Sequence, residues 1–305
     1  MNYFFLKNWH KIVNKKKYKQ LKLKENTEKK IKFYKLNIKN KIDTIHEKIK
    51  KNKKLNFIHS GHIGDLIYSL PVIKKLSETH ECSFYIQKNK PINVDYPGHP
   101  SGNVLLDEKI IRKLLPLLKL QSYFKLVDIY NNEEIDVDLD LCREIPINVS
   151  FHQVRWYVHI TGIHVNMEDA FLDVNPKKNF DSKVIILRTF RNRNHFIDYK
   201  FLSKYKNLLF VGLENEFNDL KNDVPNLEFY NCKDFHEMAQ IIKASRFYLG
   251  NLSGGYSIAE GLKVPRLLEG CSDFPAVYPI GGNSFDFYHQ SHLEFLFEQF
   301  YNKYN

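Results

Sequence analysis

Cysteine is scarce in this 305-residue sequence, and the four cysteines lie far apart, at Cys82, Cys142, Cys232 and Cys271. They form no C-x-x-C pair, so neither a cysteine-type zinc site nor a small disulfide framework is expected. The sequence also lacks a long apolar run and a signal peptide with a small-residue cleavage site, which argues against a transmembrane helix or secretion. Scattered free thiols are typical of a reducing compartment, so the sequence predicts a cytoplasmic protein.

Three familiar site motifs are missing as well. The chain contains no G-x-G-x-x-G dinucleotide fingerprint, no G-x-x-x-x-G-K-[ST] phosphate loop and no G-x-S-x-G nucleophile elbow. The pairs His59 and His62, and His289 and His292, have no third ligand nearby in the sequence, so no metal site is expected. In contrast, 43% of the residues are hydrophobic and 14% are aromatic, which is enough for a sizeable core and excludes a disordered chain.

Arginine, glycine and proline are absent from residues 1–54, which hold 19 Lys and four acidic residues, a balance of +15. The remaining 251 residues are mildly acidic, with a balance of −4. A solvated, partly helical extension is one interpretation of the basic segment, and an anchor on an anionic membrane is another. The second rests on aromatic and apolar residues that stand beside Lys7 and Lys11, namely Tyr3, Phe4, Phe5, Leu6 and Trp9. Nucleic-acid binding is least favoured, because arginine and a known nucleic-acid module are both missing.

Beyond the basic segment, short apolar runs alternate with helical stretches, which is typical of α/β units with parallel strands. Strands are predicted at 55–59, 83–87, 135–142, 183–187, 208–212, 227–230, 247–250 and 266–269. Helices are predicted at 65–76, 108–120, 153–161, 199–206, 216–222, 235–244, 255–262 and 292–304. A polar linker at 173–182 divides the body into two Rossmann-like domains, 55–175 and 183–290, followed by a C-terminal helix at 291–305.

The first informative loop reads His59-Ser60-Gly61-His62-Ile63-Gly64-Asp65, between a predicted strand and a predicted helix. Gly61 and Gly64 permit a tight turn and the close approach of a ligand to the backbone. Asp65 could serve as a catalytic carboxylate, or it could simply cap the helix that follows.

The second informative loop, residues 250–257, also joins a strand to a helix. Asn251, Ser253, Gly254 and Gly255 are small or polar, so they expose backbone N–H groups at a helix N-terminus, where a diphosphate would bind. An ordinary glycine-rich turn is the alternative. Because each loop follows a strand, one in each half, both could face one cleft between the domains.

These segments resemble the heptosyltransferase-type glycosyltransferases of family 9, which have the GT-B fold. The run 57–73 is similar to the N-terminal family motif, in which Ile/Met-Gly-Asp precedes a helix containing Leu/Thr-Pro, here with Pro71. The segment 235–270 resembles the family's C-terminal block, with Asn251-Leu252-Ser253-Gly254 in place of Asn-Asp-Ser-Gly. Phe210-Val211-Gly212 resembles its glycine-rich strand end. Two features depart from the family: Leu252 replaces its aspartate, and its histidine a few residues later has no counterpart.

The resemblance implies transfer of a sugar from a nucleotide-sugar, with inversion and without an obligatory metal or other cofactor. Asp65 would be the general base, with Gly61, His62 and Gly64 beside the acceptor. The donor would contact Gly212, Asn251, Ser253, Gly254 and Gly255. The acceptor would be a glycan or glycolipid, in lipopolysaccharide or other polysaccharide synthesis, and the enzyme could sit on the inner face of the membrane.

Charged side chains near predicted strand ends supply the remaining candidates. Arg188, Arg191 and Arg193 follow the first strand of the second half, and arginine binds phosphate through its bidentate fork. We rank Arg188 first because it adjoins the strand; a solvated basic loop is the alternative. Asp140, the last of three alternating aspartates on the predicted strand 135–142, could contact the acceptor. Two other functions stay open: a non-catalytic nucleotide-sugar or glycan-binding protein, and a nucleotide-sugar epimerase.

Overall fold

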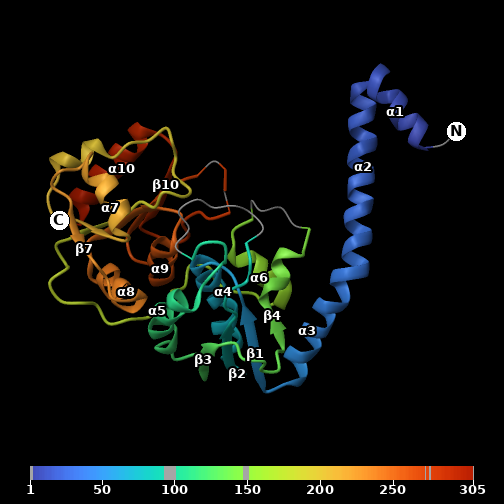
Figure 1. Cartoon of the computed structure of the whole chain (residues 1–305), viewed down its shortest axis with the longest axis horizontal. Coiled ribbons are helices and arrows are strands. Elements are labelled where there is room, and N and C mark those ends of the chain that lie inside the picture. Colours follow the sequence, from blue (N-terminus) through green and yellow to red (C-terminus); the bar gives the residue numbers. More distant parts are fainter. Residues whose placement is uncertain (1–2, 93–100, 147–150, 272, 275, 305) are drawn as a thin grey trace.

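Two parallel β-sheets, each flanked by helices, form the body of the protein, and a long helical arm extends from it (Figure 1). The computed structural model describes residues 3–92, 101–146, 151–271, 273–274 and 276–304. The two parallel sheets and their flanking helices confirm the α/β architecture predicted from the sequence. Within those residues, no helix is both long enough and apolar enough to cross a membrane.

The first sheet has four parallel strands in the order β3-β2-β1-β4. Its strands are β1 (Lys54–His59), β2 (Glu81–Ile86), β3 (Leu126–Ile129) and β4 (Val137–Asp138). The helices of this half are α4 (Ile63–Leu76), α5 (Glu108–Lys119), the 3₁₀ helix η2 (Leu139–Arg143) and α6 (Val154–Thr161). Nine of the 14 residues of α4 are buried, and the helix contacts α6 and, in the second half, α9.

The second sheet has six parallel strands in the order β10-β9-β8-β5-β6-β7. Its strands are β5 (Val184–Leu187), β6 (Leu208–Val211), β7 (Glu228–Tyr230), β8 (Phe247–Asn251), β9 (Arg266–Glu269) and β10 (Ser284–Phe287). Its helices are η3 (Lys200–Lys204, 3₁₀), α7 (Glu214–Lys221), α8 (Phe235–Ala244), α9 (Gly254–Leu262) and α10 (Gln290–Lys303). Helices α8 and α9 contact α5 and α4, so one apolar core continues from the first half into the second.

Both sheets reverse their strand order at one point, between β1 and β4 in the first and between β5 and β8 in the second. In open parallel sheets, ligands bind in the crevice beyond the carboxyl ends of the strands at such a point. The loops that follow these four strands are therefore where a site is expected. They include both loops that the sequence singled out.

The basic segment is helical nearly throughout, as α1 (Tyr3–Val13), α2 (Lys15–Phe33), a π-helical turn η1 (Tyr34–Ile38) and α3 (Lys39–Lys51). Its two ends differ in their surroundings. Ile42, Ile45 and Ile49 are buried on one face of α3, which packs against α6, whereas α2 contains no buried residue. Residues 38–51 thus belong to the packed body, and only the part before them is the solvated extension that the sequence suggests.

Two predicted elements are corrected. The expected strand 135–142 pairs with β1 only at Val137 and Asp138, because the Asp138 side chain accepts a hydrogen bond from the Asp140 N–H (2.9 Å) and turns the chain into η2. The expected helix 199–206 is the short 3₁₀ helix η3. Tyr199 and Leu202 are both buried there, and residues three apart share one side of a 3₁₀ helix. Strands β3 and β10, which have exposed or half-buried positions at the sheet edges, were not predicted.

Candidate functional site

A cavity of about 330 Å³ lies where the two sheet crevices meet. Residues of the loop after β1 line one side, and residues of the loops after β5, β6 and β8 line the other. The two sides come into contact: a Cβ atom added at Gly254 would lie 3.0 Å from Cγ2 of Ile63. Both informative loops therefore face one cleft, as their positions in the sequence predict.

Asp65 stands in the first turn of α4 and lines this cavity. Its carboxylate accepts hydrogen bonds from the His62 N–H (2.9 Å), from Nη2 of Arg143 (2.9 Å) and from Nε2 of Gln153. The bond from His62 makes Asp65 part of the helix cap, so the capping interpretation is correct; exposure to the cavity leaves the catalytic one open. A side chain at Gly61 would overlap Asp65 and Arg143, which explains glycine there.

The charge of Asp65 is strongly stabilised. Burial raises the pKa of its carboxyl group, but Arg143, His62 and His59 together with the His62 amide lower it more, so this pKa lies below the ordinary aspartate value. For the neighbouring His62, burial is the main effect and lowers the imidazole pKa. At neutral pH the cavity therefore holds an ionised aspartate, a form that can accept a proton.

Asp140 lies beneath the cavity and is not part of its lining. Its carboxylate accepts hydrogen bonds from Nδ1 of His59 (2.8 Å), from the Ser60 N–H (3.1 Å) and from Lys90 (3.0 Å), and it also pairs with Arg143. The predicted role of Asp140 in contacting the acceptor is thus replaced by a supporting one. It holds Arg143, which in turn holds Asp65.

On the opposite wall, Ser253 caps α9, with its Oγ accepting a hydrogen bond from the Tyr256 N–H (3.2 Å). Ser253, Gly254 and Gly255 all line the cavity. A Cβ atom at Gly255 would lie 2.6 Å from Cδ1 of Leu187, so a larger residue there would have to displace the Leu187 side chain. Since the first N–H groups of a helix have no partner within the helix, this terminus presents donors and a positive dipole end to the cavity.

The two leading arginines occupy different environments. Arg188 is buried and bidentate on Glu269, with Nε to Oε2 at 2.8 Å and Nη2 to Oε1 at 2.9 Å, and it does not line the cavity. Arg191 does line it. Ranking Arg188 before Arg191 as the phosphate ligand is therefore wrong. The sequence could not show this, because the carboxylate that binds Arg188 comes from β9, 81 residues away.

Asn251 is also buried, and its role is indirect. Its Oδ1 accepts a hydrogen bond from the Thr189 N–H (2.9 Å), and its Nδ2 donates to the carbonyls of Thr189 (3.0 Å) and Arg191 (2.7 Å). Asn251 thus shapes the loop after β5 and positions Arg191. Gly212 lines the cavity, in accordance with its predicted place at a strand end.

Several residues of the site had no signal in the sequence. Gln153 and Arg143 reach Asp65 from 88 and 78 residues away, and nothing local marks them. Glu216 is buried in the cavity wall; burial raises the pKa of its carboxyl group, while the Phe190 amide binds it at 3.2 Å. Within the described ranges, no cluster of three or more His, Cys, Asp or Glu side chains could hold a metal ion.

The sequence matches no known family model. No curated protein matches it either. The structure aligns with that of a family 9 glycosyltransferase from Veillonella parvula DSM 2008, with a TM-score of 0.52 and 9% identity, over 81% of this chain and 88% of that one. The chain has the fold of a family 9 glycosyltransferase. E. coli heptosyltransferase WaaC with ADP (TM-score 0.49, 11% identity, 81% and 99% covered) and E. coli ADP-heptose LPS heptosyltransferase II (0.49, 10%, 82% and 99%) are also similar.

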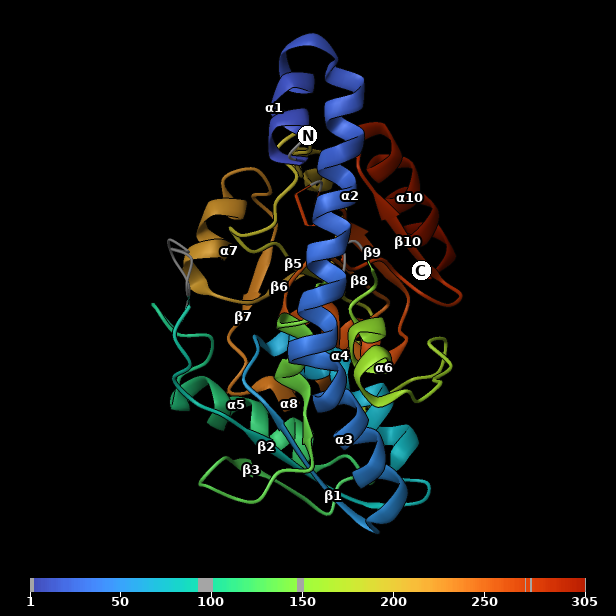
Figure 2. The same ribbon diagram turned by 90° about the vertical axis from the view of Figure 1, so that its right-hand side faces the viewer.

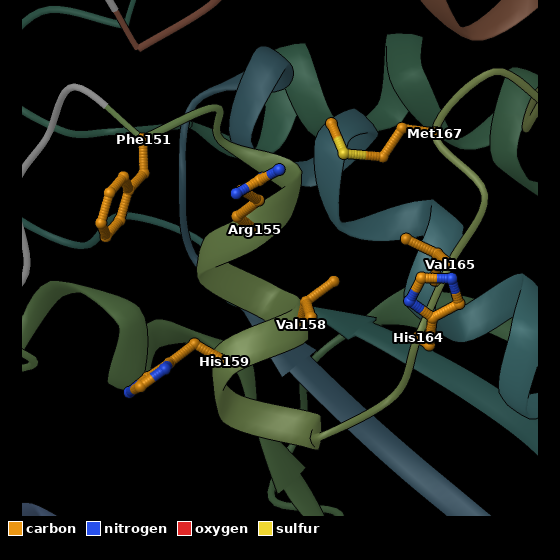
Figure 3. A pocket seen from close by; sticks show the side chains of 7 residues that line it. All are labelled: Phe151, Arg155, Val158, His159, His164, Val165 and Met167. Carbon is orange, nitrogen blue, oxygen red and sulfur yellow. The ribbon is translucent and has the colours of Figure 1, made fainter.

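This GT-B protein has a second cavity, of about 350 Å³, around α6 and the segment after it (Figure 3). Figure 3 shows Val165 and Met167 on the segment beside α6, while Phe151 and His159 lie on the other side of the helix. This cavity shares no lining residue with the cleft. Its side chains do not converge on one point, so the cleft remains the candidate site.

Proposed function

We propose that this protein is a glycosyltransferase, which moves a sugar from a nucleotide-diphosphate sugar to a hydroxyl group of a glycan or lipid-linked acceptor. The main support for this proposal is that Asp65 and the N-terminus of α9 line one cavity from opposite walls. A base for the acceptor and a diphosphate site for the donor are the two things that such a transfer needs. The fold of family 9 adds support.

On the donor side, the diphosphate would bind the backbone N–H groups at the start of α9. Arg191 would add a positive charge, and the nucleoside would lie between the loops after β5 and β6, near Phe190 and Glu216. As the sugar–phosphate bond breaks, its electron pair passes to the diphosphate. The helix terminus and the guanidinium would stabilise that charge, which is the role that a metal ion has in metal-dependent transferases.

On the acceptor side, the hydroxyl oxygen would attack the anomeric carbon from the face opposite the leaving diphosphate, so one displacement inverts the configuration. Asp65 would receive the hydroxyl proton. Arg143 and Gln153 hold its carboxylate in the ionised form, and one of these donors would give way to the acceptor hydroxyl. A lipid-linked acceptor would lie at a membrane surface, and the +15 charge of residues 1–54 suits an anionic one.

Nucleotide binding is the first test of the proposal. We expect one of ADP, UDP, GDP or CMP to raise the melting temperature, and its sugar conjugate to raise it further. A ligand at about 100 times its dissociation constant stabilises by about 2.7 kcal/mol, which is several degrees for a chain of this size. If neither the nucleotides nor their sugar conjugates shift the melting temperature, the donor site is absent and the proposal fails.

Arg191→Met is expected to weaken binding of that nucleotide by about ten- to a hundredfold, since a hydrogen bond to a charged group contributes about 1.5–3 kcal/mol. The melting temperature of the free protein should fall by less than in Arg188→Met, because Arg188 is buried whereas Arg191 lines the cavity. Arg112→Met is the matched control, because Arg112 pairs only with the exposed Glu108 and lies outside the cavity. Calorimetric titration of both variants measures the effect. Equal affinities would remove Arg191 from the donor site.

The pH dependence of glycosyl transfer should depend on the ion pair between Asp65 and Arg143, because Arg143 lowers the pKa of the Asp65 carboxyl group. The base form of Asp65 exists above its pKa, so activity is lost only as the pH falls below about 4, the ordinary aspartate value. Arg143→Met removes a cation that lowers this pKa, and the acid limb of kcat/KM should move up by about one pH unit. Arg143→Lys keeps the charge and should keep the limb near its original place. An unmoved limb in the Met variant would contradict the assignment.

One observation favours a second candidate, a non-catalytic nucleotide-sugar-binding protein. Leu252 lines the cavity where family 9 has an aspartate, so one polar contact of the family is missing here. Both candidates predict nucleotide binding, but they differ in turnover. Release of nucleoside diphosphate in the presence of donor and acceptor would eliminate the binding-protein alternative.

A further inference from the structure

Residues 3–37 form an arm that projects from the body (Figure 1 and Figure 2). Asn14 begins α2, with its Oδ1 accepting a hydrogen bond from the Lys17 N–H (2.9 Å), and reverses the chain so that α1 packs along the first turns of α2. No residue from 8 to 37 is buried, and burial begins at Ile38. From Lys15 to residue 37 the arm is 23 residues long, or about 35 Å at 1.5 Å per residue.

Helix α1 presents apolar side chains to solvent. Trp9 is 60% exposed, Ile12 83% and Val13 55%, and their spacing of three and four residues places them on one helix face. Among residues 8–33, the half-buried positions are His10, Tyr18, Leu21 and Glu25. If α1 and α2 were stabilised only by packing on each other, the apolar face of α1 would be buried between them. Because Trp9, Ile12 and Val13 are exposed instead, this face is available to contact another surface.

The positive charge of the arm indicates which kind of surface its apolar face would contact. Residues 1–37 hold 12 Lys and two acidic residues, a balance of +10, whereas the rest of the chain has 34 Lys+Arg and 33 acidic residues, a balance of +1. A second copy of the arm would repel the first, and the nearly neutral body offers it little attraction. An anionic surface is attracted by about 1 kcal/mol per lysine close to it. Because the arm has lysine without arginine and combines it with an exposed Trp, Ile and Val, a lipid interface fits better than a nucleic acid.

We propose that the α1–α2 arm docks this protein on an anionic lipid bilayer, with Trp9, Ile12 and Val13 entering the interfacial layer and the lysines contacting the head groups. The arm would then act as a spacer that holds the body within about 35 Å of the surface. This docking is independent of glycosyl transfer, since no arm residue lines the cleft cavity.

Tryptophan fluorescence tests the insertion directly. The chain has two tryptophans, Trp9 and the half-buried Trp156, so Trp156→Phe leaves Trp9 as the only reporter. We expect its emission to shift to the blue with phosphatidylcholine vesicles containing about 30% phosphatidylglycerol, and not with phosphatidylcholine alone. The full chain is used, and an unshifted emission with the anionic vesicles would overturn the proposal.

Co-sedimentation with the same vesicles separates the two contributions. The triple variant Trp9→Ala, Ile12→Ala and Val13→Ala should bind at least about tenfold more weakly. Lys15→Glu, Lys16→Glu and Lys17→Glu should do the same, and acidic residues at the start of α2 suit its dipole, so the hairpin should still form. Phe196→Ala is the matched control, because Phe196 is 82% exposed on the body, and its binding should be unchanged.

Other outcomes would decide against the proposal. Unchanged vesicle binding in both arm variants, or self-association of the free chain that the triple variant abolishes, would each overturn it. Tighter binding to duplex DNA than to anionic vesicles at about 0.15 M salt would do so as well. The nucleotide-induced rise in melting temperature is measured without vesicles, so failure of membrane docking and failure of the proposed transferase are distinguishable.

Discussion

Replacing Asp65 with asparagine is expected to lower glycosyl transfer by a factor of about 100 to 10,000, the usual contribution of a general base. Asparagine has nearly the same shape: its amide oxygen can still accept the hydrogen bond from the His62 N–H, and its NH2 group can donate to Gln153 once that side-chain amide turns over. It cannot take the acceptor proton, so the loss should appear in kcat. The measurement is initial rate with the donor that the nucleotide panel identifies.

Donor binding should survive in this variant, because the diphosphate and nucleoside contacts lie on the opposite wall of the cavity. Asp128→Asn is the matched control, since Asp128 is an exposed residue of β3, outside that cavity, and its replacement should leave the rate unchanged. Full activity in Asp65→Asn would show that Asp65 is only the cap of α4. Loss of nucleotide binding together with activity would mean that the variant damages the fold rather than the chemistry.

The fold was predictable where apolar runs and caps coincide. Helix α8 was predicted at its observed bounds, because Asp234 caps it, with its side chain accepting a hydrogen bond from the Glu237 N–H (2.8 Å), and an apolar face follows. Strand β9, wholly buried, was predicted equally well. Strands β3 and β10 lie at sheet edges, where one face meets solvent and the run of apolar residues is interrupted. A pattern based on burial cannot detect them.

The arm shows a different limit. The isoleucines of α3 recur at helical spacing, but lysines between them hide the pattern, and the composition of the whole segment suggested solvent. Helix α3 is packed because α6 lies beside it, whereas α2 has no such neighbour. This contact joins residues more than a hundred positions apart, as His46 and the Ile160 carbonyl at 3.0 Å show. Composition averages over both parts and so cannot divide them.

For the site, local sequence located the loops but not the partners of their side chains. Glycines and small residues after β1 and β8 reveal where backbone can approach a ligand, because that property is local. Whether an arginine faces a ligand or a buried carboxylate depends on residues far along the chain. Arg188 and Arg191 are three positions apart and chemically identical, yet Glu269 on β9 binds only the first.

Arg188→Met is therefore expected to destabilise the fold by about 3–5 kcal/mol, the usual cost of leaving a buried charge without its partner. Glu269 is fully buried, and besides Arg188 the Asn194 N–H binds it, at 2.6 Å. Arg188 also donates to the Ile197 carbonyl (2.9 Å) and lies 4.5 Å from the Tyr199 ring. A fall in melting temperature of about 10 °C should follow.

Two comparisons identify the cause of that loss. Arg112→Met breaks an exposed ion pair and should cost less than about 1 kcal/mol. Adding Glu269→Leu to Arg188→Met removes the stranded carboxylate, and part of the stability should return, because the penalty is that of an uncompensated charge rather than of a missing arginine. If instead Arg188→Met kept its melting temperature and lost nucleotide affinity, Arg188 would be the phosphate ligand that its place beside the strand suggests. The contrast with Arg191→Met, which should lose affinity with a smaller fall in stability, separates the two arginines by role.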